Sequence, residues 1–108
     1  MKKYIPLKSN GTKSTHLSVE LFYSLGGLNY WTSKEEPRGY YLSVTPVERY
    51  ERNGIGMEGF IAFSGLKTLV KPVTRKSAKA EREAEDLAPE FEADLIAAVL
   101  AKNGLALA

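Results

Sequence analysis

Cysteine is absent from this chain of 108 residues, and histidine occurs once, at His16. A chain without cysteine has no disulfide, thiol nucleophile or zinc–thiolate site, and a single histidine leaves no second one for a histidine-based metal site or triad. The sequence therefore predicts no metal and no other cofactor. The lack of cysteine also fits the reducing environment of the cytoplasm.

Long apolar runs are missing as well, since none approaches the roughly 18 consecutive residues that a membrane helix needs. The opening Met1–Pro6 segment begins like a signal peptide, but Pro6, Lys8 and Lys13 prevent an apolar stretch from following. We therefore expect a cytoplasmic protein with no export signal and no membrane partner.

Charge is distributed unevenly along the chain. Residues 1–76 contain 12 Lys and Arg against 6 Glu, a net charge of +6, and residues 77–108 contain 3 against 7 acidic residues, a net charge of −4. A basic region of this kind can bind an anionic partner, or the two halves can be solvated surfaces of opposite sign.

Hydrophobic patterning predicts one α+β domain over residues 16–108, preceded by a flexible basic arm over residues 1–15. The stretch 17–23 alternates apolar and polar residues, which is typical of a half-buried strand. Gly26 and Gly27 predict a turn, residues 28–33 a second strand, and residues 34–39 a polar turn. Together these segments predict an antiparallel sheet of about four or five strands.

The sheet is expected to be built around a hairpin over residues 40–63, because Asn53-Gly54 is a preferred pair for a two-residue type I′ turn. Counting outward from this turn pairs Arg52 with Ile55 and Val44 with Phe63. Pro46 predicts an edge or a bulge in the first strand. One face of the hairpin is then a core face, formed by Tyr40, Leu42, Val44, Met57, Ile61 and Phe63.

After the hairpin, residues 64–73 fit either a helix or a strand, and the β-branched Thr68 and Val70 with Pro72 favour the strand. The C-terminal region is predicted to be helical and broken near Pro89, which suits the first turn of a second helix. Residues 75–87 have a thin apolar stripe of Ala80, Ala84 and Leu87. We therefore expect that segment to be a solvated linker or a surface free for a partner.

Catalytic machinery is not indicated, and we expect no enzyme. The acidic pairs, such as Glu35 with Glu36, lie in polar stretches that give no sign of the burial needed to shift a pKa. Gly54, Gly56 and Gly59 match the dinucleotide fingerprint in spacing, but they fall inside a hairpin and not between a strand and a helix.

The second face of the hairpin combines aromatic and basic residues, and this combination can stack unpaired bases while cations contact phosphates. The opposite interpretation is that a helix covers this face and makes Tyr41 and Phe60 core residues. The candidate nucleic-acid-binding residues are Trp31, Lys34, Arg38, Tyr41, Arg49, Arg52 and Phe60.

Two functional hypotheses remain open. The first is a small non-enzymatic interaction module that associates with itself or with another protein through the sheet or the C-terminal helices. The alternative is a domain that binds single-stranded nucleic acid.

Residues 40–63, with a long strand, an Arg- and Glu-rich turn and a Gly-Phe-Ile strand, resemble in layout the single-strand-binding folds of the transcriptional-coactivator and whirly type. This resemblance implies nucleic-acid binding on the sheet and dimerisation through the helix. The small size and lysine-rich start also resemble accessory proteins of bacterial mobile elements.

Overall fold

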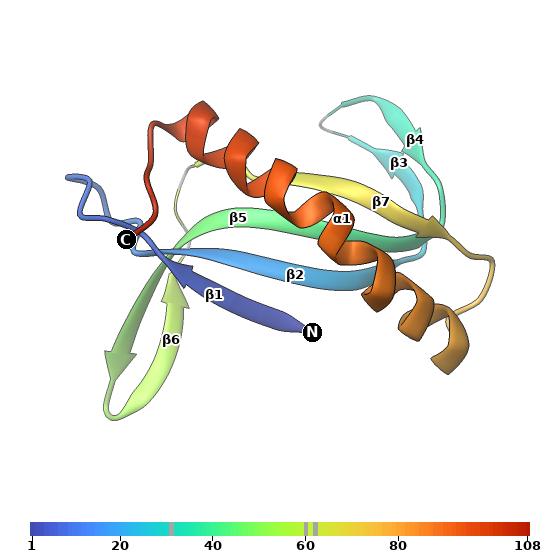
Figure 1. Cartoon of the computed structure of the whole chain (residues 1–108), viewed down its shortest axis with the longest axis horizontal. Coiled ribbons are helices and arrows are strands. Elements are labelled where there is room, and N and C mark those ends of the chain that lie inside the picture. The colour runs from blue at the N-terminus through green and yellow to red at the C-terminus, as the bar shows by residue number, and fades with distance from the viewer. Residues whose placement is uncertain (31, 60, 62) are drawn as a thin grey trace.

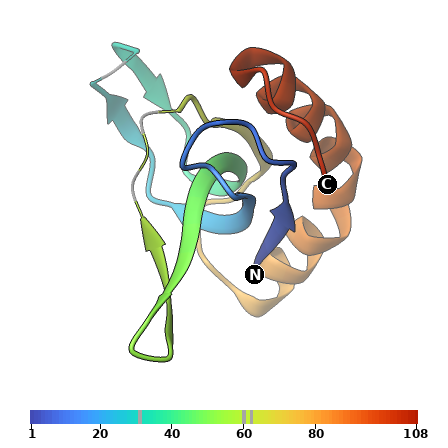
Figure 2. The same cartoon turned by 90° about the vertical axis from the view of Figure 1, so that its left-hand side faces the viewer.

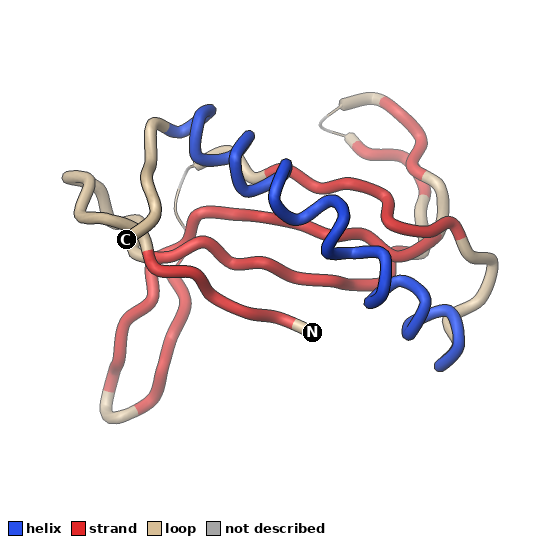
Figure 3. Tube along the Cα trace, viewed as in Figure 1, coloured by secondary structure: helices blue, strands red, loops and turns tan. Residues whose placement is uncertain are grey.

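The computed structural model describes residues 1–30, 32–59, 61 and 63–108, and it places one long helix across an antiparallel sheet (Figure 1; Figure 3). The elements follow one another as β1 (Lys2–Pro6), β2 (His16–Ser24), β3 (Gly27–Asn29), β4 (Lys34–Glu36), β5 (Gly39–Arg52), β6 (Ile55–Gly59), β7 (Leu66–Pro72) and α1 (Ala78–Asn103). The main sheet has five strands, so the predicted α+β class and strand number are confirmed.

β5 is the central strand of this sheet. On one side it pairs with β2 over the length of β2, and β1 pairs with the other side of β2. On its second side β5 pairs first with β7, over Gly39 to Val44, and then with β6, over Glu48 to Arg52. The strand predicted over residues 17–23 is thus confirmed as β2, and the strand favoured for residues 64–73 is confirmed as β7.

Pro46 lies between the part of β5 that pairs with β7 and the part that pairs with β6. Proline has no N–H to donate to a ladder, so a change of partner at this point leaves no donor unsatisfied. The predicted pairing of Val44 with Phe63 is wrong, because β6 ends at Gly59 and Val44 pairs with Leu66 of β7. The predicted hairpin therefore extends to residue 59 and not to residue 63.

The turn of the hairpin agrees with the sequence pattern. Asn53 and Gly54 both have positive φ angles, 54° and 77°, as a type I′ turn requires. The predicted pairs Arg52 with Ile55 and Arg49 with Glu58 are both present.

The core lies between the sheet and α1. Alternate residues of β2 and β5 point toward the helix, as the two-residue period of a strand dictates. The largest fully buried side chains are Leu17, Leu42, Val19, Val44, Val99 and Pro46. Of the predicted core face, Tyr40 is buried with Leu42 and Val44, whereas Ile61 and Phe63 are half-buried and Met57 is exposed.

α1 begins after Ser77, whose side chain accepts a hydrogen bond from the Ala80 N–H at 3.1 Å, and it ends at Gly104 in the left-handed conformation. The predicted break near Pro89 is wrong, because the helix continues through that residue. Pro89 removes one backbone hydrogen bond on the exposed side of the helix. Apolar residues before and after it pack on the same sheet, and this tertiary burial outweighs the local cost.

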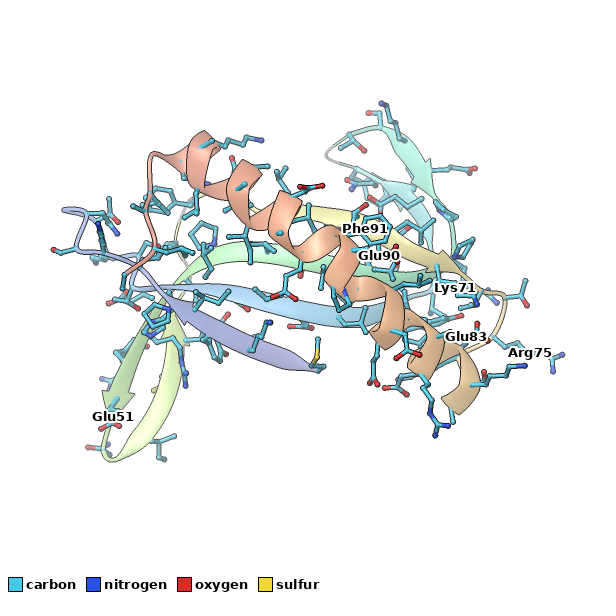
Figure 4. The ribbon with its side chains drawn as sticks, in the orientation of Figure 1. Glu51, Lys71, Arg75, Glu83, Glu90 and Phe91 are labelled. Carbon is cyan, nitrogen blue, oxygen red and sulfur yellow. The ribbon has the colours of Figure 1, made fainter. Side chains whose placement is uncertain are left out.

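The first half of α1 packs on the sheet and does not project from it. Ala80, Ala84 and Ala88 are buried there, and their small side chains allow the helix to approach the strands closely. The side chains of Lys71 and Glu83 form an ion pair between β7 and α1 (Figure 4). The expectation that residues 75–87 are a linker or a free partner surface is therefore wrong for the alanine stripe.

β3 and β4 form a separate two-stranded hairpin where one strand and a polar turn were predicted. Gly26 enters the hairpin with a φ of 76°, and a Cβ at that position would lie 2.7 Å from the carbonyl oxygen of Glu36. Ser33, just before β4, also has a positive φ of 57°. Gly26 lies where the chain passes from β2 to β3, and Ser33 lies in the turn between β3 and β4, and the apolar pattern of residues 28–33 did not reveal this hairpin.

The segment that follows β1 lies beside the C-terminal residues of the chain. Residues 2–6 of the segment predicted as an arm pair with β2 as strand β1. Leu7 forms an antiparallel bridge with Leu107, and the Lys8 N–H donates to the Ala106 carbonyl at 2.9 Å. The division of the chain into an arm and a domain at residue 15 stays a prediction.

Within the described part of the chain, no helix has the length and apolar character needed to cross a membrane.

Candidate interaction surface

Tyr41 is one of the aromatic residues predicted to stack on nucleic-acid bases, and the structure buries it. Its side chain is only 4% exposed, and its ring stacks on that of Phe22 with centroids 6.0 Å apart. Its hydroxyl donates to the Pro37 carbonyl at 2.7 Å, and burial raises the pKa of Tyr41. No helix covers it, because α1 lies on the other face of the sheet (Figure 2). Of the two interpretations weighed for this residue, the open face is wrong, and the expectation that Tyr41 is a core residue is confirmed although α1 is not what covers it.

A cleft of about 530 Å³ lies beside Tyr41, between the β3–β4 hairpin and β7. The ammonium group of Lys67 lies 2.6 Å from a carboxylate oxygen of Glu36 and 5.0 Å from the centroid of the Tyr41 ring. The Asn29 side chain donates to the other oxygen of Glu36 at 2.8 Å. Lys67 first, and Asn29 second, hold the pKa of Glu36 below its usual range. The Glu36–Lys67 ion pair joins the small hairpin to the main sheet, and the Asn29–Glu36 hydrogen bond links the two strands of the hairpin.

Arg49 lies at the other end of β5. The central carbon of its guanidinium group lies over the Tyr4 ring, 3.9 Å from the ring centroid. The Tyr4 hydroxyl donates to Glu58 at 2.7 Å, and the ammonium group of Lys2 lies 2.9 Å from the same oxygen. The Tyr4 hydrogen bond and then Lys2 lower the pKa of Glu58, and the contact with Glu58 raises the pKa of Lys2. Arg49 and Lys2 are therefore engaged with an aromatic ring and a carboxylate, respectively.

The remaining predicted residues do not gather around Tyr41. Arg38 is exposed and donates to the Thr74 carbonyl at 2.9 Å, and Lys34 lies exposed in β4. Arg52 is exposed beside the turn between β5 and β6. Trp31 and Phe60 lie outside the described residues.

The length of β5 separates the two ends of the predicted site. Tyr41 and Arg49 are eight residues apart on one strand, a span of about 26 Å. The sequence pattern placed both residues on one face and could not show how far apart they are.

Large apolar side chains are exposed on both hairpins. Tyr30 is 87% exposed and Leu28 52% exposed at the β3–β4 hairpin, and Ile55 is 67% exposed at the β5–β6 hairpin. The β5–β6 hairpin also exposes Tyr50 and Met57. Exposed apolar side chains that cluster in this way are characteristic of binding surfaces, whereas single ones are ordinary.

Neither hairpin is covered by α1: the β5–β6 hairpin extends beyond the helix, and the β3–β4 hairpin lies across the main sheet from it (Figure 2). Figure 1 shows the β5–β6 hairpin leaving the helix-covered part of the sheet at one end, and the β3–β4 hairpin lying near the other end. Tyr50 lies on the same face of β5 as the buried Tyr40 and Leu42, since its position in the strand differs from theirs by an even number. It is exposed because the helix does not reach it. Sequence periodicity fixes the face of a residue but not the reach of a helix, and so Met57 was assigned to the core.

Sequence reasoning missed Leu28, Tyr30 and Ile55 as candidate binding residues. A usable signal was present for Ile55, which follows directly on an Asn-Gly turn and so lies at a hairpin tip. Leu28 and Tyr30 offered no such signal, because they fell inside a segment predicted to be an ordinary strand.

Among the described residues, no group of three or more His, Asp or Glu side chains is arranged to hold a metal ion. The layout resemblance of residues 40–63 to single-strand-binding folds stays a prediction. No family model, curated protein or solved structure matches this chain.

Proposed function

We propose that this protein is a small non-enzymatic interaction module that binds other protein molecules through its two hairpins. The observation that supports this proposal is the exposure of Leu28, Tyr30 and Ile55 on hairpins that leave the packed core. Tyrosine is among the residues that contribute most to the free energy of binding at protein interfaces, and burial of large aliphatic side chains by a partner adds a hydrophobic contribution. A cytoplasmic location is part of the proposal, since the chain has no cysteine.

The way in which the β3–β4 hairpin is held also supports the proposal. An isolated two-stranded hairpin is only marginally stable in water. Here the Glu36–Lys67 ion pair and the Asn29 hydrogen bond fix the inner side of the hairpin, and the left-handed Gly26 sets its direction. Fixed hairpins lose less conformational entropy on binding than flexible loops do, and this favours affinity.

The single-stranded nucleic-acid alternative has less support. Base stacking requires an accessible ring, and Tyr41 is buried. Phosphates would also compete with the carboxylates that already contact Lys67 and Lys2. If the alternative is right, a labelled single-stranded oligonucleotide should bind at low salt with an affinity that falls steeply as salt rises. Binding that weakens on the Arg49→Ala substitution would then replace the proposal made here.

The proposal can be tested by changing the hairpin surface while leaving the core intact. A triple variant with Leu28→Ser, Tyr30→Ser and Ile55→Ser removes the exposed apolar groups. A matched control with Ala93→Ser, Ala97→Ser and Ala101→Ser changes the exposed side of α1 by the same number of residues. Both variants should fold, because surface substitutions usually change stability by no more than about 0.5 kcal/mol.

Immobilised wild type and both variants are first used to capture binding proteins quantitatively. Each captured protein, and the wild-type chain as a candidate partner, is then purified and titrated against the three immobilised proteins to measure its affinity. We expect wild type and the α1 control to bind alike and the hairpin variant to bind at least about tenfold more weakly, which corresponds to 1.4 kcal/mol. Equal binding by all three proteins would show that the hairpins are not the binding surface.

A further inference from the structure

The outer side of the β3–β4 hairpin presents an apolar residue directly beside an acidic one. Leu28 and Glu35 are cross-strand partners, so their side chains lie on the same side of the hairpin. Both are exposed. The neighbouring residues Asn29 and Glu36 point the other way and contact each other, and Glu36 reaches Lys67 of the main sheet.

The β5–β6 hairpin presents an apolar residue directly beside a basic one. Ile55 and Arg52 are cross-strand partners and share one side of the hairpin with Tyr50 and Met57. Arg49, Glu51 and Glu58 occupy the opposite side, as their position in the register requires. In Figure 4, Glu51 lies at the outer end of this hairpin, well away from α1.

These two patches complement each other in charge as well as in apolar character. Each consists of an exposed aliphatic side chain next to one charged side chain, and the two charges have opposite signs. Among the ion pairs of the described residues, none includes Glu35 or Arg52. Both charges are therefore available to a partner without breaking an existing pair.

We propose that the partner of this surface is a second copy of the chain, with the Leu28–Glu35 patch of one copy packed on the Ile55–Arg52 patch of the other. This inference rests on the proposed function, because it specifies what the hairpins bind. One chain carries both patches, and they lie toward opposite ends of the molecule (Figure 1). Each copy can then offer its free patch to a further contact. The association either closes into a ring or continues as a chain of copies.

The contact is small compared with the 1,200–2,000 Å² or so that stable interfaces bury, so the association should be weak. We expect dissociation constants on the order of 0.1–1 mM, measured by sedimentation equilibrium over a wide range of protein concentration. Glu35→Arg and Arg52→Glu each place like charges opposite each other. Each substitution should weaken association at least about tenfold.

The double variant with both substitutions exchanges the two charges and should restore association to within about threefold of wild type. Two controls reverse a charge on the other side of the same hairpins, namely Lys34→Glu and Glu51→Arg, and they should leave association unchanged. A wild-type protein that stays monomeric at millimolar concentration overturns the inference. Controls that weaken association as much as Glu35→Arg and Arg52→Glu also overturn it.

Site-directed cross-linking tests the same contact directly, since the chain has no cysteine of its own. The single variants Leu28→Cys and Ile55→Cys are mixed and oxidised, and the linked peptides are identified by mass spectrometry. Disulfides between position 28 of one copy and position 55 of another are expected to dominate. A predominance of links between identical positions, or no links, contradicts the proposed contact.

The outcomes separate this inference from the proposed function. If the wild type is monomeric and the hairpin triple variant no longer binds a different protein that the wild type binds, the hairpins bind partners but not a second copy. If the triple variant associates with itself and binds every other protein as strongly as the wild type does, both proposals are wrong.

Discussion

Leucines, tyrosines and β-branched residues occur both in the part of the sheet that α1 covers and in the two hairpins beyond it, and their surroundings differ sharply. Leu42 in the covered part is fully buried, whereas Leu28 in the β3–β4 hairpin is half exposed. Tyr40 and Tyr50 differ in the same way: they lie on the same face of β5, and Tyr40 is buried whereas Tyr50 is exposed. On the side of the sheet that faces α1, the reach of the helix separates buried Tyr40 from exposed Tyr50, whereas Leu28 is exposed because its hairpin forms a separate sheet that α1 does not cover.

Similar residues therefore contribute to the free energy of folding under the helix and to the free energy of binding in the hairpins. Under the helix, burial of apolar surface stabilises the fold by about 25 cal/mol for each Å² removed from water. In the hairpins the exposed part of each apolar side chain makes no such contribution in the isolated chain, and that part is realised only when a partner covers the same surface. Stability and binding should therefore respond to substitutions in different places.

The largest expected effect comes from truncating the same residue type in the two regions. Leu42→Ala should lower the free energy of unfolding by about 2–5 kcal/mol, since it leaves a cavity in the core. Leu28→Ala should change it by no more than about 0.5 kcal/mol. Urea denaturation of both variants measures the difference. Similar losses in the two variants would show that the hairpin is as tightly packed as the core, which contradicts the comparison.

A second effect tests how the covered region keeps α1 continuous. Pro89→Ala restores a backbone N–H that can donate to the carbonyl four residues earlier and removes a ring that is unfavourable inside a helix. The free energy of unfolding should rise by up to about 3 kcal/mol. Ala97→Gly, at another exposed position of the same helix, should instead lower it by about 1 kcal/mol. No gain from Pro89→Ala would mean that the helix is locally relaxed around the proline.

Much of the fold could be predicted from the sequence wherever one local rule acted without competition. The alternation over residues 17–23 and the Asn53-Gly54 turn each indicated the right element, because period and turn chemistry are local. The break at Pro89 was a wrong prediction, since a local penalty of a few kcal/mol was outweighed by packing of the whole helix on the sheet.

The candidate surface was harder to predict than the fold, because exposure depends on distant parts of the chain. Tyr41 is an aromatic residue of the kind that binds bases, yet its ring packs on Phe22 and its hydroxyl donates a hydrogen bond to the Pro37 carbonyl. Met57 has the pattern of a core residue, yet 38% of it is exposed. Neither outcome follows from a pattern within one strand.

The third prediction concerns the alanines of α1, which lie on its covered and uncovered sides. Ala84→Leu inserts a large side chain between helix and sheet at a fully buried position and should cost about 1–3 kcal/mol of stability. Ala97→Leu places the same group in solvent and should be neutral within about 0.5 kcal/mol. Thermal unfolding of the two variants compares the two sides. Equal melting temperatures would contradict close packing of the alanine stripe.

The smallest effect concerns the link between the two regions, the Glu36–Lys67 ion pair. Because Lys67 and Asn29 hold the pKa of Glu36 below its ordinary value, the contribution of Glu36 is present above that ordinary pKa. The contribution is lost as pH falls through the lowered pKa of the folded state. For a partly exposed pair it should be at most about 1 kcal/mol, or roughly fivefold in amide exchange protection of the β3–β4 hairpin.

Glu36→Gln should therefore reduce protection of that hairpin near neutral pH and make no difference well below the usual glutamate pKa of about 4.3. Glu35→Gln, which removes a neighbouring charge that joins no ion pair among the described residues, is the matched control and should leave protection unchanged. If Glu36→Gln lowers protection equally in the hairpin and under α1, the two regions open together. The hairpin would then unfold as part of the cooperative core, and the comparison between a core and a separately held hairpin would fail.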